Sequence, residues 1–296
     1  MQKELDKILT ETKGTFGIAI KHLERDEETI INGDKFFQLA SVVKVQILTT
    51  LMHEVGKGNL DLLERVTIKN TDKVPGSGVL KEMDEGMTVT IKDLATLMII
   101  ISDNMATDKL LKIVGLENVN RYMKELGLEQ LSIDYSIWKL LALSAGLEAE
   151  PQTLEKYAEI TLRLNDRANW EIKSHNPIFQ ENSANNTATV IEFNRLLEKI
   201  QLSDGIPESE STQILDILSR QQVRQRLPRL LPEGTKVAHK TGTIGKTAND
   251  AGIIYLPDNK GTLIITIFSE GNESLDEGAA IISKISLAAF EYYLEK

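Results

Sequence analysis

The sequence contains no cysteine, which excludes disulfide bonds, thiolate nucleophiles and zinc sites built on cysteine. Its few histidines stand far apart, without a spacing typical of metal ligands: His22, His53, His175 and His239. No apolar run approaches the roughly 18 residues that a helix needs to span a membrane. We therefore expect no metal, no cofactor and no membrane span in this chain.

The sequence also lacks a basic stripe. Its 34 lysines and arginines are outnumbered by 44 aspartates and glutamates, and the net charge of −10 is spread along mixed segments. Nucleic-acid binding needs clustered cations that displace counterions, so we expect no nucleic-acid partner. The 296 residues, 41% of them hydrophobic, suffice for one large domain or two modest ones with a sizeable core.

Strand patterns occur at both ends of the sequence. Residues 15–21 and 28–32 flank a charged turn, which predicts an antiparallel hairpin. Near the C-terminus, the strand-like runs TKVAHK, DAGIIYL and TLIITIF are followed by a helical pattern. Helical patterns fill most of the middle, including one that begins at Thr90 with Asp93 as a capping-box acid.

This arrangement predicts an α+β fold. We expect one antiparallel sheet built from the N- and C-terminal segments, flanking terminal helices, and an inserted all-helical lobe. Residues 1–40 and 208–296 are expected to form the sheet lobe and residues 41–207 the helical lobe. The cleft between the two lobes is the natural place for a site.

Ser41 and Lys44 form a Ser-x-x-Lys motif at the start of an apolar helix pattern that ends at Gly56. Residues three apart share a helix face, so the amine can reach the hydroxyl, and a desolvated lysine can act as a base near neutral pH. A helix N-terminus also directs free N–H groups at developing negative charge. The same spacing recurs at Ser136 and Lys139, so the motif alone is weak.

Two further polar motifs gain meaning only in combination. Ser102–Asn104 (Ser-Asp-Asn) follows the apolar run LMIII, and by itself this triplet suggests only a helix cap. Lys240–Thr243 (Lys-Thr-Gly-Thr) lies at the end of the run TKVAHK, and by itself it suggests only a turn. In the order Ser-x-x-Lys, Ser-Asp-Asn, Lys-Thr-Gly, the motifs form the signature of class A β-lactamases and penicillin-binding proteins. Ser136 does not fit this signature, because it follows Ser-Asp-Asn.

The sequence thus resembles the class A β-lactamase-like serine hydrolases from about residue 15 to the C-terminus. The segments FQLASVVK, GSGVL, TIKDLATLMIIISDNMATDKLL, PEGTKVAHKTGTI and DAGIIYLP carry the resemblance. It implies that Ser41 is the acylated nucleophile and Lys44 its proton partner. It also implies that Ser102 relays a proton towards the leaving nitrogen and that Asn104 holds the side-chain amide of the substrate.

The resemblance implies a substrate-binding wall at Lys240, Thr241, Gly242 and Thr243. Lys240 would supply positive potential, the two threonines would contact the substrate carboxylate, and the backbone N–H groups of Ser41 and Thr243 would form the oxyanion hole. Many relatives carry an arginine on the next strand, but the stretch ANDAG has none. Arg226, fourteen residues before Lys240, matches a position from which some family members supply the arginine near the substrate carboxylate. The alternative interpretation of Arg226 is a solvated arginine at the end of a helix.

The expected substrate is a small β-lactam or a peptidoglycan-type amide. By the same resemblance, we expect an extracytoplasmic protein that is a monomer. The N-terminal stretch itself has no apolar segment typical of a signal peptide.

The main departure from the family concerns deacylation. Class A enzymes carry Glu-x-x-Leu-Asn, whose glutamate holds the hydrolytic water, and that motif is absent here. The segment 131–186 is instead extended. Glu150, in the stretch Glu-Pro-Gln-Thr-Leu, is the best match to the missing glutamate. The other carboxylates considered for its role are Glu148, Glu171 and Glu181.

Because an acyl-enzyme without a positioned base persists, several functions stay open. The protein is a slow β-lactamase, a penicillin-binding D-alanyl-D-alanine peptidase, an esterase, or a non-catalytic envelope or interaction protein on the same fold.

A phosphate-binding loop at Gly245–Thr247 is excluded by its surroundings. A P-loop needs a glycine five positions before Gly245, where this sequence has Lys240, and it needs a helix afterwards, where a strand-like run follows. Residues 244–247 are instead expected to form the turn between two strands.

Overall fold

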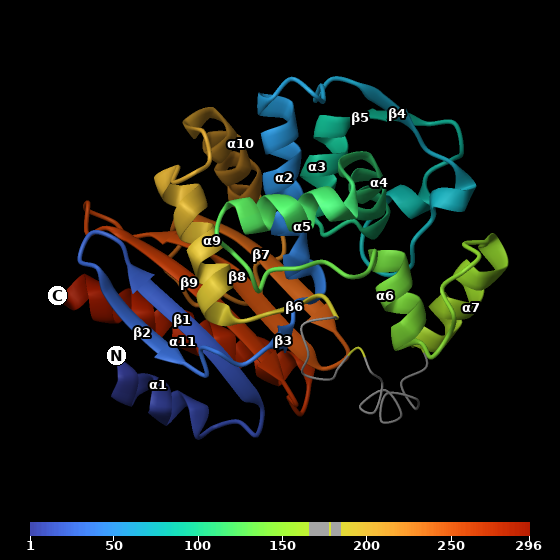
Figure 1. Ribbon diagram of the computed structural model, residues 1–296. Helices are drawn as coiled ribbons and strands as arrows, with labels where there is room; N and C mark the ends of the chain where they lie inside the picture. The colour runs from blue at the N-terminus through green and yellow to red at the C-terminus, as the bar shows by residue number, and fades with distance from the viewer. Residues whose placement is uncertain (166–177, 179–184) are drawn as a thin grey trace.

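The computed structural model describes residues 1–165, 178 and 185–296 (Figure 1). Its centre is a five-stranded antiparallel sheet in the order β2-β1-β9-β8-β7. The strands come from the two ends of the chain: β1 (Thr15–His22), β2 (Glu27–Ile31), β7 (Val237–Ile244), β8 (Thr247–Tyr255) and β9 (Thr262–Glu270). The predicted hairpin, the three C-terminal strands and the α+β fold class are confirmed.

The two terminal helices, α1 (Gln2–Leu9) and α11 (Leu275–Glu295), pack together on one face of the sheet (Figure 1). Alternation along the strands explains this layer, because side chains at every second position share a face. Ile265 and Ile267 of β9 belong to the core shared with α11, whereas Ile264 and Phe268 belong to the core on the opposite face. The sheet is therefore covered on both sides.

The opposite face is covered by the middle of the chain. Phe193 of α9 packs edge-on against Phe268 of β9, with ring centroids 5.5 Å apart. Within the described residues, the helices of this region are α2 (Lys44–Gly56), α3 (Ile91–Ile100), α4 (Asn104–Val114), α5 (Leu116–Glu125), α6 (Ile137–Ser144), α7 (Leu154–Asn165), α9 (Val190–Leu202) and α10 (Glu208–Ser219).

Short elements connect these helices. Two small two-stranded sheets pair β3 (Phe37–Gln38) with β6 (Thr187–Ala188) and β4 (Arg65–Thr67) with β5 (Thr88–Thr90). The 3₁₀ turns described between these elements include η1 (Ala40–Val43), η2 (Asn70–Asp72) and η3 (Leu80–Glu82). The division of the chain into lobes at residues 40 and 208 remains a prediction.

The capping box predicted at the start of α3 is confirmed. Thr90 Oγ1 accepts a hydrogen bond from Asp93 N at 3.0 Å, and Asp93 Oδ2 accepts one from Thr90 N at 2.9 Å. These bonds satisfy two donors that a helix start leaves unpaired. They fix the beginning of the helix whose far end leads into Ser102.

Two element boundaries differ from the sequence expectation. The last strand before the turn continues through Lys240–Thr243 as far as Ile244, and Ile244 pairs with Thr247 in the β7–β8 ladder. The expected turn at residues 244–247 therefore shrinks to Gly245 and Lys246, where Gly245 has a positive φ of 58°. A two-residue hairpin turn favours glycine at such a position, because its backbone must adopt the left-handed conformation.

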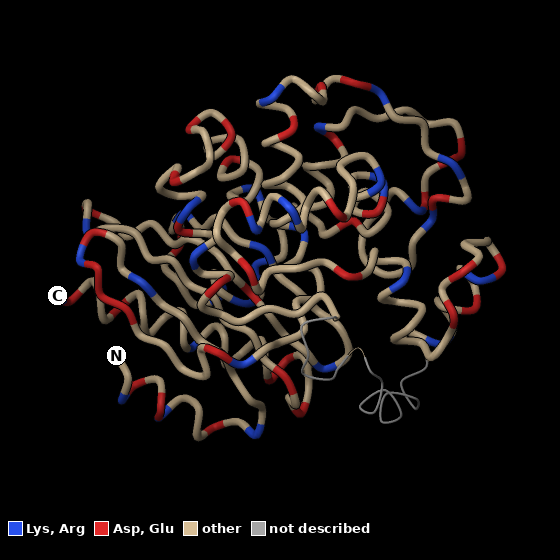
Figure 2. The backbone as a smooth tube through the Cα atoms, in the orientation of Figure 1, with Lys and Arg blue, Asp and Glu red and all other residues tan. Residues whose placement is uncertain are grey.

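Charged residues of both signs are interspersed along the trace (Figure 2). Lysines and arginines alternate with aspartates and glutamates on the outer helices and loops. This distribution agrees with the absence of a basic stripe in the sequence. Over the described parts of the chain, no helix is both long enough and apolar enough to span a membrane.

Candidate active site

Ser41 lies in the 3₁₀ turn η1, which runs directly into α2 at Lys44. The sequence predicted that Ser41 begins an α-helix; a tighter first turn is found instead, which is common at helix N-termini. Ala40 adopts a positive φ of 49° just before the serine. Backbone N–H groups in a first turn have no partner one turn back, so the N–H of Ser41 is available to a ligand.

Lys44 is completely buried at the start of α2. Its Nζ donates to Ser102 O at 2.7 Å, to Ser102 Oγ at 3.0 Å and to Asn104 Oδ1 at 2.8 Å. Burial lowers the pKa of Lys44 to about 7, although the charges of Asp103 and Asp108 oppose this change. A substantial fraction of this amine is therefore neutral near pH 7 and can accept a proton.

Ser102 stands at the corner between α3 and α4 with a positive φ of 60°. A non-glycine residue in this region is strained and persists only when its surroundings hold it, as often happens at functional sites. The hydroxyl of Ser102 accepts hydrogen bonds from both Lys44 and Lys240, each at 3.0 Å. Its own proton remains free to be donated to a third group.

Asp103 holds the corner in place. Its Oδ1 accepts from Ala106 N at 2.9 Å as the cap of α4, and its Oδ2 accepts from Val79 N at 2.7 Å and Leu80 N at 2.9 Å. A Cβ on Gly78 would lie 2.3 Å from the Asp103 carboxylate, so this loop needs glycine there. The helix cap is thus also the anchor of the loop 73–80.

Asn104 is fixed by the same loop. Its Nδ2 donates to Pro75 O at 2.8 Å, and its Oδ1 accepts from Lys44. Ser77 adds a donor that the sequence did not single out, since its Oγ donates to Ser102 O at 2.6 Å. The only signal for Ser77 was its place in the turn-rich segment GSGVL.

The sequence also missed Asp108, a buried carboxylate on α4. It accepts hydrogen bonds from Ile137 N at 2.7 Å and Trp138 N at 2.8 Å, which caps the N-terminus of α6. Burial raises the pKa of Asp108 to about 6, against the effect of these bonds and of the Lys44 charge. A charged residue on the apolar face of α4 was the available signal.

The wall opposite Ser102 is β7, one of the two edge strands of the sheet. Ile244 and Thr247 flank the two-residue turn, so they form a hydrogen-bonded pair, and such pairs alternate along the ladder. The next pair, Thr243 with Ala248, is therefore a non-hydrogen-bonded pair, in which the backbone N–H groups of the two residues do not bond each other. The backbone N–H of Thr243 consequently points away from β8, towards the open edge of the sheet.

Gly242 allows β7 to approach the nucleophile turn. A Cβ at this position would lie 2.5 Å from Leu39 O and 2.8 Å from Val42 Cγ2. No side chain fits in that space, so glycine is required for the close packing of β7 against η1. This contact brings the backbone of Thr243 next to the turn that carries Ser41.

Lys240 is completely buried on β7. Its Nζ donates to Ser102 Oγ at 3.0 Å and to Thr241 O at 2.7 Å. Burial, followed by the charge of Lys44, holds the pKa of Lys240 well below its ordinary value, while Asp250 opposes this change. Two buried amines thus meet at one hydroxyl.

Arg226 reaches the same wall from the segment that follows α10. It is 7% exposed, and its Nη1 donates to Gly242 O at 2.6 Å and to Asn249 O at 2.5 Å, while its Nη2 donates to Thr243 Oγ1. Arg226 is therefore part of the wall, and the alternative of a solvated surface arginine is wrong. Burial lowers the pKa of Arg226, and the charge of Asp250 opposes this change.

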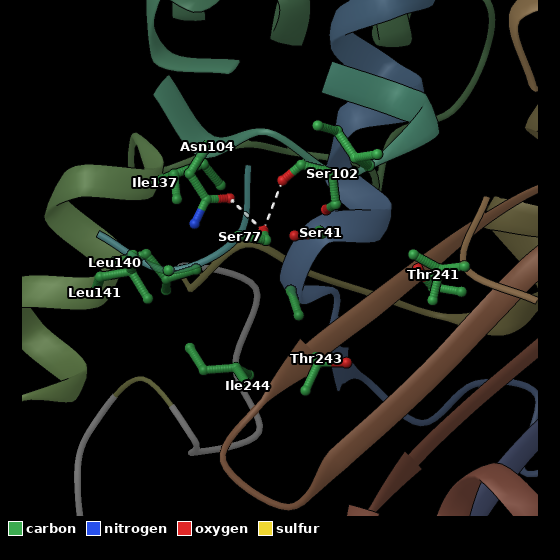
Figure 3. Close-up of a pocket in the computed structure, with 14 residues that line it drawn as sticks. Ser41, Ser77, Ser102, Asn104, Ile137, Leu140, Leu141, Thr241, Thr243 and Ile244 are labelled. Atoms are coloured by element: carbon green, nitrogen blue, oxygen red, sulfur yellow. Dashed lines mark hydrogen bonds between the residues drawn. The ribbon is translucent and has the colours of Figure 1, made fainter. Parts of the chain in front are cut away.

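Ser41, Ser102, Asn104, Thr241 and Thr243 line one cleft of about 340 Å³ (Figure 3), and the buried amines of Lys44 and Lys240 contact Ser102 from behind this lining. In Figure 3, the Ser41 hydroxyl lies between Ser102 and Asn104 on one side and Thr243 on the other. Helix α6, from the extended segment 131–186, contributes an apolar part of the lining. The lining residues are Ala40, Ser41, Gly76, Ser77, Ile101, Ser102, Asn104, Ile137, Leu140, Leu141, Val223, Thr241, Thr243 and Ile244.

Glu150, the proposed deacylation base, is exposed between α6 and α7 and is not among the residues that line the cleft. Its backbone carbonyl accepts from Lys156 Nζ at 2.7 Å. The structure therefore does not bring Glu150 together with Ser41. Glu148 also lies between α6 and α7, whereas Glu171 and Glu181 fall outside the described residues, as does His175.

The competing motifs have structural explanations. Ser136 caps α6, since its Oγ accepts from Lys139 N at 3.2 Å, and Lys139 Nζ lies 4.7 Å from the centre of the Tyr135 ring. Lys246 is exposed in the turn between β7 and β8, where no helix follows. The second Ser-x-x-Lys is therefore a cap, and the apparent phosphate loop is a hairpin turn.

Comparisons with known proteins agree with this geometry. A model of the beta-lactamase enzyme family matches residues 1–293. The extended-spectrum beta-lactamase PER-1 of Pseudomonas aeruginosa is 26% identical over 306 residues, covering 100% of this chain and 88% of that protein. The crystal structure of a beta-lactamase from Sphaerobacter thermophilus DSM 20745 superposes with a TM-score of 0.79 at 27% identity, covering 100% of this chain and 97% of that one.

A penicillin-binding protein shares the fold. A mutant of PBP-A, solved as an acyl-enzyme complex with penicillin G, superposes with a TM-score of 0.77 at 23% identity. The alignment covers 100% of this chain and 96% of that chain.

Proposed function

The chain belongs to the beta-lactamase enzyme family, and from that premise we propose that it is a serine hydrolase that opens β-lactam amides through an acyl-Ser41 intermediate. The observation that carries the proposal is the convergence of Lys44 and Lys240 on the hydroxyl of Ser102, which lines the same cleft as Ser41. No single motif would support it. The similarity to PER-1, whose name identifies it as a β-lactamase, supports the same substrate class.

In the acylation step, Ser41 Oγ attacks the carbonyl carbon of the lactam and gives its proton to the neutral amine of Lys44. The carbon–nitrogen bond of the ring then breaks. Ser102, hydrogen-bonded to Lys44, donates its proton to the departing nitrogen and is reprotonated by the Lys44 ammonium. No atom leaves the substrate, because both halves of the opened ring remain attached to Ser41 as one ester.

The negative charge that develops on the carbonyl oxygen needs donors fixed in advance. The N–H groups of Ser41 and Thr243 are the proposed oxyanion hole: one belongs to a helical first turn and the other points off the edge of β7. Gly242 supports this role by allowing the two backbones to approach each other. Preorganised donors of this kind are often the largest single contribution to acyl transfer.

Substrate binding is proposed on both walls of the cleft. Asn104 holds the amide of the substrate side chain, while Lys240, Thr241 and Thr243 attract and bind its carboxylate. Arg226, which donates to Thr243 Oγ1, adds the positive charge that other members place on the following strand. A carboxylate bound to such charged donors makes hydrogen bonds roughly twice as strong as neutral ones.

Deacylation decides between hydrolysis and lasting penicillin binding. Glu150 remains the predicted base, although its exposure and its place outside the cleft lining favour a slow step. This observation, with the shared fold of PBP-A, supports a penicillin-binding peptidase or esterase as the second candidate. We also propose an extracytoplasmic location and a monomeric state.

A reporter β-lactam tests the proposal. The wild-type protein should open a chromogenic β-lactam or retain a fluorescent penicillin, and Ser41→Ala should abolish both signals. Ser136→Ala is the matched control, because it removes the serine of the other Ser-x-x-Lys and should retain acylation. If wild type is not acylated, or if Ser41→Ala is acylated equally well, the proposal is wrong.

A further inference from the structure

A buried ionisable pair next to the cleft takes no part in the acylation steps. His239 and Asp250 are both fully buried, and His239 Nδ1 lies 2.9 Å from Asp250 Oδ1 and 3.0 Å from Asp250 Oδ2. Among the described residues, His239 Nε2 has no hydrogen-bond partner. The ring is therefore not linked to Ser41, and the pair does not form a Ser-His-Asp triad.

The strand register places Asp250 beside the anion-binding wall. Asp250 pairs with Thr241 across the β7–β8 ladder, and directly opposite residues share a face of the sheet. His239 and Thr243, two positions on either side of Thr241, share that face as well. Thr241 and Thr243 line the cleft, and the buried carboxylate of Asp250 stands directly opposite Thr241 in the ladder.

Asp250 also fixes the backbone that carries Arg226. Asp250 Oδ2 accepts a hydrogen bond from Leu227 N at 3.0 Å. From α11, Ser283 Oγ donates to Arg226 O at 3.0 Å and Ser286 Oγ donates to Leu227 O at 2.8 Å. The main chain is thus held at three points, and from there the guanidinium reaches the carbonyls of Gly242 and Asn249 and the hydroxyl of Thr243.

Asp250 also provides a negative charge that offsets the positive charges of Arg226 and Lys240. Arg226 and Lys240 are both buried, and burial lowers the pKa of each. The negative charge of Asp250 opposes that change for both residues. Asp250 therefore favours the charged forms of the two cations on this wall.

We propose that Asp250 is a positioning residue for recognition of the substrate carboxylate. Held by His239, it anchors the Arg226 segment and balances Arg226 and Lys240, so that the wall is an anion site before substrate arrives. This inference rests on the proposed function, since it assumes that a β-lactam carboxylate binds at Arg226 and Lys240.

A penicillin and its carboxylate methyl ester form the test pair, because esterification removes the negative charge that this wall would recognise and adds only a methyl group. The second-order rate constant of acylation is measured for each by intact mass. Wild type should prefer the free acid by about tenfold or more. Asp250→Asn should slow acylation by the free acid about tenfold to a hundredfold and change the methyl ester by less than about threefold.

Thr266→Val is the matched control, because it also removes a buried polar group from the sheet. The hydroxyl of Thr266 donates to Asn194 Oδ1 and makes no contact with the Arg226 segment in the hydrogen bonds described. It should affect the two compounds equally. A loss caused only by structural damage would also be equal for both in Asp250→Asn, and that result, or an unchanged preference for the free acid, overturns the inference.

If Asp250→Asn does not fold, His239→Gln takes its place, because it leaves the carboxylate but removes the ring. A smaller loss of the same preference is expected, and an unchanged preference overturns the inference. The proposed function fails separately, by the absence of acylation of wild type by both compounds.

Discussion

The pH dependence of acylation follows from the burial of Lys44. Only the neutral amine can take the Ser41 proton, and burial lowers the pKa of Lys44 to about 7. At pH 8 about nine-tenths of the amine is neutral, and at pH 5 about one-hundredth is. We therefore expect the acylation rate constant to fall about 90-fold from pH 8 to pH 5, close to tenfold per unit at the acid end.

Lys44→Arg separates this base from other groups that titrate in the same range. A guanidinium stays protonated at every pH of the experiment. The variant should lose a factor of about 10²–10⁴ in acylation, which is the usual contribution of a positioned general base. What activity remains should show no inflection near pH 7.

Stopped-flow mixing with a chromogenic β-lactam measures the step directly, because the burst phase reports acylation before any deacylation. A rate constant that is flat between pH 5 and pH 8 in wild type would refute the assignment of Lys44 as the base. An inflection near pH 7 that survives unchanged in Lys44→Arg would refute it as well, since another group would then be titrating.

Three further predictions concern stability and deacylation. The pKa of Lys44 falls from 10.5 to about 7 on folding, so the unfolded chain binds more protons between these two pH values, and the free energy of unfolding declines as pH falls through them. Lys44→Met removes this cost. Urea denaturation should therefore show a free energy of unfolding about 2–5 kcal/mol higher than wild type at pH 7 and almost the same as wild type near pH 10.5. Asp103→Ala leaves three backbone donors unpaired and should cost about 2–4 kcal/mol in the same assay; a loss within experimental error would contradict its anchoring role. Gln replacements of Glu150, Glu171 and Glu181 should lengthen the lifetime of the acyl-enzyme only at the position that activates water, as followed by decay of the adduct mass; if none does so, none of the three is the base.

Local chemistry predicted much of the fold and of the site. The hairpin of β1 and β2 and the capping box of Thr90 and Asp93 depend on neighbouring residues, so sequence patterns are sufficient for them. The three motifs identified Ser41 and its partners because each residue type has a chemical task at a fixed spacing. Long-range packing then brought these residues to one cleft.

Other features depend on distant contacts that leave no local pattern. The polar residues Lys240–Thr243 continue β7 because the ladder with β8 and the contact of Gly242 with η1 hold them extended. Ser77 and Asp108 act through hydrogen bonds to residues about 25–30 positions away, and the acidic side chain of Asp108 alone gave no hint of its partners. Arg226 was identified by resemblance, and its place in the wall is known only from its contacts.

The mass of the protein after exposure to a β-lactam tests the central claim most directly. Intact mass should rise by the full mass of the compound, because ring opening releases no fragment, and peptide mapping should place the added mass on Ser41. An adduct on any other residue, or no adduct at any time from milliseconds to hours, would contradict the account.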